Sequence, residues 1–168
     1  MTDGISRFVY ATYIRTTPEQ LWSALTTADF MKKYWFGMHL ETDWTVGGPW
    51  RLLFADGRVA DEGEVAEFDP PRRLALRWRN RWKPEFAEEG ETFCVLELEP
   101  ADGAVKLTID HSIPRPDSKL IEAVSGGWPK IAANLKSLLE TGSPVFRSTA
   151  PEHERGETTS SRQRSVSA

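Results

Sequence analysis

His111 is the best candidate of this chain for acid–base chemistry, and Cys94 is its single thiol. His111 ends a predicted strand beside the last helical segment, where an imidazole could bind an anion or act as a general base. A hydrogen-bonded structural histidine is the favoured interpretation. Asp110 points to the opposite face of a regular strand, so no dyad is expected. Cys94 lies in a strand of alternating polarity and is interpreted as a small core residue rather than a nucleophile.

Three arginines would suit a carboxylate ligand if they faced a pocket. Arg77, Arg79 and Arg81 alternate with other residues and so share one face of a predicted strand, with Trp78 on the other face. If Trp78 faces the core, the arginines face water, and this arrangement is favoured. The reverse arrangement would place cations in a pocket that fits a carboxylate.

The sequence lacks the motifs of common metal, nucleotide and hydrolase sites. Its histidines, His39, His111 and His153, lie far apart and form no HExxH or Cys/His pattern. There is no P-loop and no Gly-x-Ser-x-Gly. No metal or cofactor is therefore expected, and the sequence indicates no nucleophile–base pair that would make the chain an enzyme.

Composition narrows the class of protein further. The chain has 168 residues, a mean hydropathy of −0.46 and no apolar run near the roughly 20 residues that cross a bilayer, so no membrane insertion is expected. A net charge of −4 argues against nucleic acid as a partner. No signal peptide is visible, and a single cysteine fits a reducing compartment, so a cytoplasmic location is predicted. For the oligomeric state, a monomer or a homodimer is expected.

Turn residues and periodicity predict the elements that position these side chains. Asp-Gly pairs separate segments of alternating polarity, which is typical of antiparallel hairpins. The pattern predicts a first strand over 7–15, a helix opened by Thr17-Pro18, a short helix over 28–35, a long helix over 117–141, and strands over 39–44, 50–54, 58–69, 73–79, 92–99 and 105–111. The segment 79–90 is expected to be a charged loop, and Pro129 to kink or break the long helix at 125–128.

The chain changes character near Gly142. Residues 143–168 are rich in Ser, Thr, Arg and Glu and contain Phe146 as their single aromatic residue. Such a segment buries too little apolar surface to offset its ordering entropy. The sequence therefore predicts one domain over 1–142 and a disordered polar tail over 143–168. A solvated tail is favoured over a phosphorylated or partner-binding arm.

Several stretches, in order, resemble motifs of one family. They are Thr17-Pro18-Glu19-Gln20-Leu21-Trp22, Met31-Lys32-Lys33-Tyr34-Trp35-Phe36, Gly47-Gly48-Pro49-Trp50-Arg51, Gly63-Glu64-Val65 followed by Pro70-Pro71-Arg72-Arg73-Leu74, and Gly127-Trp128 followed by Leu135 and Leu138. Over residues 7–141 the chain resembles the bacterial branch of the AHSA1 family, which is named for the activator of Hsp90 ATPase. This family belongs to the START-like (SRPBCC, Bet v 1-like) superfamily.

The resemblance implies an α+β helix-grip fold. In this fold a curved antiparallel sheet of about six to seven strands wraps around a long C-terminal helix, and two short helices follow the first strand. Many members have a deep pocket for hydrophobic ligands between sheet and helix. The candidate ligand-binding residues of this chain are Trp35, Trp50, Phe54, Trp78, Phe93, His111, Val124 and Trp128. The alternative is that these rings simply fill the core.

Three functions remain open on this basis. The first is binding of a small hydrophobic molecule, a lipid or an aromatic polyketide-like compound, in the cavity. The second, which rests on the analogy with the family's namesake, is a protein-interaction role as a co-chaperone of an Hsp90-type chaperone. The third is a cyclase- or hydrolase-like enzyme that uses the same pocket, with His111 as the one candidate acid or base.

Overall fold

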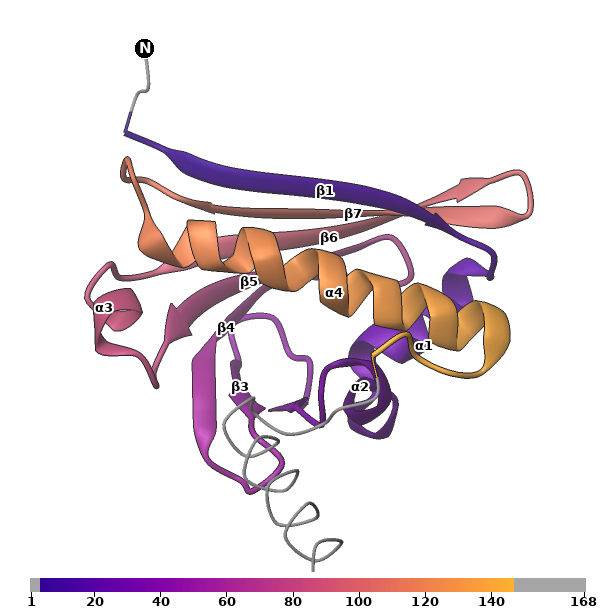
Figure 1. The fold of residues 1–168 in the computed structure, drawn as a ribbon, viewed down its shortest axis with the longest axis horizontal. Coiled ribbons are helices and arrows are strands. Elements are labelled where there is room, and N and C mark those ends of the chain that lie inside the picture. Colours follow the sequence, from indigo (N-terminus) through magenta and orange to yellow (C-terminus); the bar gives the residue numbers. More distant parts are fainter. Residues whose placement is uncertain (1–3, 147–168) are drawn as a thin grey trace, which may run out of the picture.

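The computed structural model describes residues 4–146 and shows one curved sheet with helices on its concave side (Figure 1). All seven strands are antiparallel to their neighbours, in the order β1-β7-β6-β5-β4-β3-β2. The elements are β1 (Ser6–Ile14), α1 (Pro18–Thr26), α2 (Ala28–Tyr34), β2 (His39–Thr42), β3 (Pro49–Leu53), β4 (Val59–Asp69), β5 (Arg73–Asn80), α3 (Pro84–Ala87), β6 (Thr92–Ala101), β7 (Ala104–Ile113) and α4 (Lys119–Thr141). The predicted helix-grip architecture is confirmed.

Short hairpins set the register of the sheet. The β6–β7 hairpin pairs Ala101 with Ala104 across a two-residue loop. Both loop residues, Asp102 (φ 47°) and Gly103 (φ 84°), adopt positive φ, as a type I′ turn requires. This turn matches the right-handed twist of the strands and places Cys94 opposite His111. The hairpin signal in the sequence therefore fixes which residues of β6 and β7 share a face.

Side-chain caps define the helix ends that the sequence predicted. The Thr17 hydroxyl accepts a hydrogen bond from the Gln20 N–H, and proline occupies the first turn of α1. Ser118 caps α4 in the same way through Ile121. Gly142, with a φ of 91°, ends α4 in the left-handed conformation that glycine adopts without strain.

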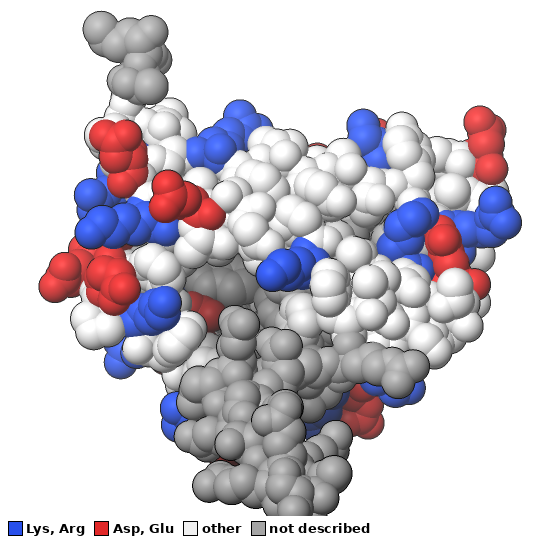
Figure 2. Space-filling view, in the orientation of Figure 1, with Lys and Arg blue, Asp and Glu red and all other residues white. Residues whose placement is uncertain are grey.

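Helix α4 crosses the concave face of the sheet and closes the core. In Figure 1, α1 and α2 lie near its C-terminal end and α3 near its N-terminal end. Its buried residues include Trp128, Ala132 and Leu135, which belong to the same apolar cluster as the inward side chains of the strands. On this face, charged side chains lie mainly toward the two ends of α4, and the surface over its middle is largely uncharged (Figure 2). No helix within residues 4–146 is long and apolar enough to cross a membrane.

Two local expectations need correction. Of the kink or break predicted at Pro129, the break was wrong, because α4 is one helix from Lys119 to Thr141. A kink within the continuous helix stays a prediction. Gly126 and Gly127 have open space where a Cβ would stand, so the backbone beside the proline ring has room to adjust. The segment 79–90, expected to be a loop, contains the short helix α3, which starts with Pro84 in its first turn.

The start of the predicted tail packs on the domain. The Phe146 N–H donates to Asn134 Oδ1 at 2.7 Å, and the Phe146 ring lies 6.2 Å from that of Phe36. The rest of the predicted tail, 147–168, falls outside the described residues, so its predicted disorder stays a prediction.

Candidate functional site

A cavity of about 230 Å³ lies between the concave face of the sheet and α4. Six of the eight residues predicted from sequence line it: Trp35, Phe54, Trp78, His111, Val124 and Trp128. They come from the end of α2, from β5 and β7, from the residue after β3 and from α4. The fold thus brings together side chains that are separated by up to 93 positions in the sequence, from 35 to 128.

The other two predicted residues lie elsewhere. The Trp50 indole is fully buried beside the cavity, where its N–H donates to the Arg77 carbonyl oxygen at 3.1 Å. Phe93 lies on the opposite, convex face of the sheet, with the Arg77 guanidinium 5.7 Å above its ring. The prediction for Phe93 is corrected because Thr92 takes the inward position, and adjacent strand residues face opposite ways.

Trp78 is the centre of the aromatic wall. Its ring lies 4.8 Å from Trp50, 6.0 Å from Trp128 and 6.4 Å from Trp35, and Trp35 lies 5.4 Å from Trp128. These spacings fall in the range where aromatic pairs gain free energy beyond the area they bury. Gly63 makes room for the Trp50 ring, because a Cβ there would stand 1.7 Å from the Arg77 carbonyl oxygen and 3.0 Å from Trp50 Nε1. The tryptophans therefore form a rigid wall on one side of the cavity.

His111 lies at the bottom of the cavity in a complete hydrogen-bond network. The Trp128 indole N–H donates to His111 Nδ1 at 3.1 Å, and His111 Nε2 lies 2.8 Å from Thr92 Oγ1. An indole can only donate, so Nδ1 accepts and Nε2 carries the proton. The Thr92 hydroxyl oxygen accepts a hydrogen bond from the Nε2–H of His111, and the hydroxyl donates one to the Trp78 carbonyl oxygen at 3.1 Å. Each polar atom of this network has a partner.

This network makes His111 a structural residue. Burial lowers the pKa of His111 to about 4, and the opposing effect of the Asp110 charge is smaller. The imidazole is therefore neutral at pH 7, and its only lone pair on a ring nitrogen is occupied by Trp128. Asp110 itself lies on the convex face in an ion pair with Arg7, so no dyad forms, as expected. The structural interpretation of His111 agrees with this geometry better than a general-base role does.

Asp61 and Asn80 form a buried polar pair in the cavity wall that the sequence reasoning missed. They face each other across β4 and β5, and Asn80 Nδ2 donates to Asp61 Oδ1 at 2.9 Å. Only 7% of Asp61 and 4% of Asn80 is exposed. Burial raises the pKa of Asp61 to about 6, against the opposing hydrogen bonds from Trp78 and Asn80. Strand alternation turns Asn80 to the same inward side as Trp78, and this alternation was the sequence signal that could have revealed the buried pair.

The α3 segment forms the mouth of the cavity. Trp82 and Phe86 line the opening, and the Trp82 ring, which is half exposed, meets Phe54 edge to face at 5.5 Å. Glu89, just after α3, accepts hydrogen bonds from the Ser118 hydroxyl and from two N–H groups at the start of α4. Burial alone would raise the pKa of Glu89, but these hydrogen bonds outweigh it and lower the pKa. These hydrogen bonds connect the segment at the cavity mouth to the start of α4, the helix that covers the cavity.

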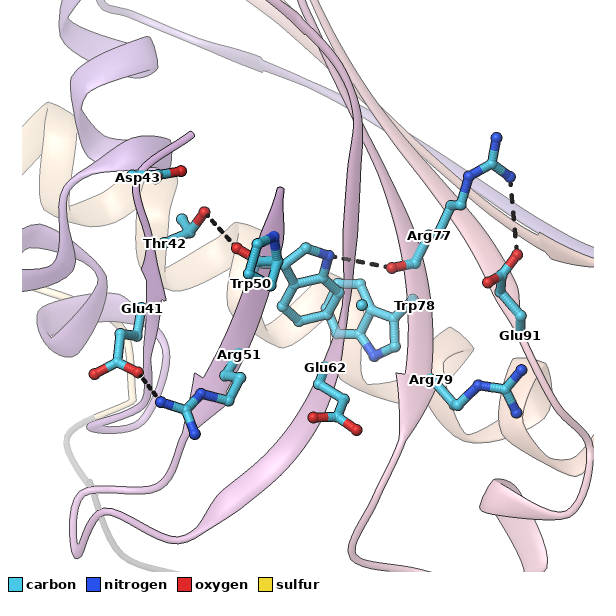
Figure 3. A pocket seen from close by; sticks show the side chains of 12 residues that line it. Glu41, Thr42, Asp43, Trp50, Arg51, Glu62, Arg77, Trp78, Arg79 and Glu91 are labelled. Atoms are coloured by element: carbon cyan, nitrogen blue, oxygen red, sulfur yellow. Dashed lines mark hydrogen bonds and ion pairs between the residues drawn. The ribbon is translucent and has the colours of Figure 1, made fainter. Parts of the chain in front are cut away.

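A second hollow, of about 590 Å³, lies on the convex face of the sheet over β2 to β5 (Figure 3). Several of its charged side chains are already in ion pairs: Arg51 with Glu41, and Arg77 with Glu91 and with Glu64 beside the hollow. Arg77, Arg79 and Arg81 are all exposed while Trp78 is buried, so the favoured orientation of these arginines is confirmed. A surface of exposed ion pairs offers little net free energy to a ligand.

The remaining reactive groups do not add a site. Cys94 is fully buried, and burial raises the pKa of its thiol, so the reactive thiolate is disfavoured. Within residues 4–146 there is no group of three or more His, Cys, Asp or Glu side chains placed to hold a metal ion. The inner cavity, with an aromatic wall and one carboxylate, is therefore the candidate site.

A curved antiparallel sheet that grips a long C-terminal helix around an aromatic cavity defines a helix-grip protein of the START-like (SRPBCC) class. Within this class the chain belongs to the AHSA1 family, because the model of that family, described as activator of Hsp90 ATPase homolog 1-like protein, matches residues 15–140. A search of curated proteins finds no significant match.

Solved structures of similar fold cover most of the chain. The crystal structure of protein MLL2253 from Mesorhizobium loti is 25% identical with a TM-score of 0.69, over 80% of this chain and 97% of that one. The solution structure of the Aha1 dimer from Colwellia psychrerythraea is 20% identical with a TM-score of 0.67, over 82% and 98%. DynU16, a protein of the dynemicin biosynthetic locus, is 25% identical with a TM-score of 0.65, over 85% of this chain and 49% of its own.

Proposed function

We propose that this protein binds a small apolar molecule in the cavity between the sheet and α4. The observation that carries the proposal is the wall of Trp35, Trp78 and Trp128, three large rings that border open space instead of filling it. Apolar surface taken from water contributes about 25 cal/mol per Å². An apolar ligand would gain that free energy over the part of its surface that the cavity wall covers.

The size of the cavity limits the ligand. Its volume of about 230 Å³ is somewhat below the roughly 300–1,000 Å³ of pockets for drug-sized molecules. A compact aromatic or short aliphatic compound fits better than a long-chain lipid. The similarity to DynU16, a protein of the dynemicin biosynthetic locus, supports a role connected with small molecules.

Native mass spectrometry of freshly purified protein tests the proposal. We expect a retained small molecule, or a change of Trp fluorescence when small aromatic compounds are added, because four indoles line the cavity or its opening. The variant Val124→Phe places a larger side chain in the cavity, so it should weaken both signals. Lys130→Phe, at an exposed position of the same helix, is the matched control and should keep them. A protein that retains no molecule and responds to none of these compounds contradicts the proposal.

A role as partner of an Hsp90-type chaperone is the second candidate, and the family's description favours it. The test is the ATPase rate of the Hsp90 of the same organism, measured with and without the purified protein. Activation that persists in Val124→Phe would support the interaction role independently of the cavity. An unchanged rate together with no co-purification removes it. An enzymatic role has less support, because the His111 lone pair is engaged by Trp128.

A further inference from the structure

We propose that the cavity selects an apolar molecule that carries a protonated amine, and that Asp61 is the residue that pairs with its ammonium group. This inference rests on the proposed function and names the chemical class of the ligand. It follows from three features of the cavity: an uncompensated carboxylate, aromatic side chains in the same cavity wall, and a rigid support for the carboxylate.

The carboxylate of Asp61 has no cation near it. Among residues 4–146, no Lys, Arg or His nitrogen lies within 4 Å of its oxygens, whereas eleven other ion pairs form in the same part of the chain. The polar groups that hydrogen-bond to it, from Asn80 and Trp78, are neutral. A buried carboxylate without a cation is costly, so it is expected where a ligand supplies the missing charge.

The aromatic wall also favours a positive group. Trp35, Trp78 and Trp128 line the same cavity as Asp61, and indole faces attract cations through their quadrupole. The mouth of the cavity shows this attraction within the protein itself. The Lys83 ammonium lies 5.2 Å from the Trp82 ring and 5.3 Å from the Phe86 ring. A carboxylate and indole faces together disfavour an anionic ligand and favour a cationic one over a neutral one.

Asn80 holds the carboxylate in place. Its Oδ1 accepts the Lys83 N–H at 2.9 Å, which leaves Nδ2 to face Asp61. The amide orientation is therefore fixed by the backbone at the end of β5. Because a preorganised group loses less entropy on binding, this support strengthens recognition of the ligand by Asp61.

The charge state of Asp61 is suited to this role. Burial raises its pKa to about 6, so at pH 7.5 the free protein still carries mainly the carboxylate. The carboxylate has already lost most of its water in the folded protein. Only the ligand's ammonium group would therefore pay a new desolvation cost when the two charges pair. A ligand hydroxyl could donate a hydrogen bond to the same oxygens but would leave the buried charge uncompensated.

Three probes of matched size test this inference: 2-phenylethylamine, 2-phenylethanol and 3-phenylpropanoate. Isothermal titration calorimetry and Trp fluorescence at pH 7.5 should show the amine binding about 10-fold or more tightly than the alcohol, with the acid weakest. Asp61→Asn should remove the preference for the amine and leave the alcohol's affinity within about 3-fold. Glu62→Gln, which changes an adjacent carboxylate on the convex face, is the matched control and should keep the preference.

The outcomes separate this inference from the proposed function. Equal binding of amine and alcohol to the wild-type protein would overturn the amine inference and leave the apolar cavity supported. Tighter binding of the acid would also overturn it. Failure of all three probes to bind, with no molecule retained in native mass spectrometry, overturns both. The comparison among the three probes uses the wild-type chain, so it does not depend on the folding of any variant.

Discussion

His111 and Asp61 are two buried titratable side chains of the same cavity, and their surroundings differ in one respect. His111 is neutral at pH 7, and both of its ring nitrogens have hydrogen-bond partners. Asp61 is mainly ionised above pH 6, and its partners are neutral. A satisfied neutral group stabilises a fold, whereas an uncompensated charge costs stability. The first arrangement is what a core requires, and the second is what a binding site requires.

The two residues should also shift stability with pH in opposite directions. His111 has a folded pKa of about 4, below its ordinary 6.5, so its contribution is present above pH 6.5 and is lost as pH falls toward 4. Asp61 has a folded pKa of about 6, above its ordinary 3.8, so its contribution is present below pH 3.8 and is lost as pH rises through 6. Between pH 4 and 6 the two effects oppose each other in the wild-type protein.

His111→Ala should produce the largest change. It leaves the Trp128 N–H and the Thr92 hydroxyl without their partner and opens a void, so we expect a loss of about 3–5 kcal/mol in the free energy of unfolding at pH 7.5. Urea denaturation measures it. The deficit relative to wild type should shrink as pH falls from 6.5 to 4. A deficit below about 1 kcal/mol at pH 7.5 would show that the network contributes little.

Asp61→Asn should stabilise the protein. The amide keeps the shape of the side chain and removes the buried charge, so we expect a gain of roughly 2–3 kcal/mol in the free energy of unfolding at pH 7.5. The gain should fall toward zero near pH 4, where folded wild-type Asp61 is protonated. Urea denaturation across this pH range measures it, with Glu62→Gln as the control. Destabilisation at pH 7.5 would indicate that the carboxylate is compensated after all.

Trp128→Phe should have a smaller effect than loss of His111. It removes the indole N–H that donates to His111 Nδ1 but keeps an aromatic ring, so we expect a loss of about 1–2 kcal/mol. The double variant with His111→Ala should lose less unfolding free energy than the sum of the two single losses, because both residues belong to one hydrogen-bond network. Full additivity in urea denaturation would contradict the hydrogen bond between them.

Asp110→Asn should have the smallest effect. Asp110 is partly exposed in a surface ion pair with Arg7 on the convex face, where solvent screens the interaction. We expect the midpoint of urea denaturation to stay within experimental error of the wild-type value. A large shift would mean that charge near β7, and not burial, decides the behaviour of His111.

The sequence predicted most of the fold and part of the site. Each predicted strand is present with its ends within two residues, because Asp-Gly turns and alternating polarity act locally. Six cavity residues were predicted correctly to lie together. Phe93 was placed on the wrong face because the neighbouring residues did not show which side of the strand faces the core. In the structure Thr92 points inward to hydrogen-bond His111, so Phe93 points outward. The Pro129 break was wrong because buried contacts on both sides hold α4 together.

Asp61 illustrates what the sequence left open. A single aspartate in a charged strand resembles many solvent-exposed residues, and its neighbour Glu62 is indeed less buried on the other face. Only the β4–β5 register sets Asp61 opposite Asn80, and only the docking of α4 and α3 removes both from water.

The sequence by itself determined the order of the strands along the chain, the hairpin turns, the capped helices and the placement of Arg77, Arg79 and Arg81 on the strand face opposite Trp78. These features depend on φ preferences and on a period of two or 3.6 residues, which act over a few neighbouring positions. The tertiary structure decided which polar residues became buried and whether each had a partner. That outcome depends on packing between segments far apart in the chain, as in the contact of Trp128 with His111 and of Asn80 with Asp61.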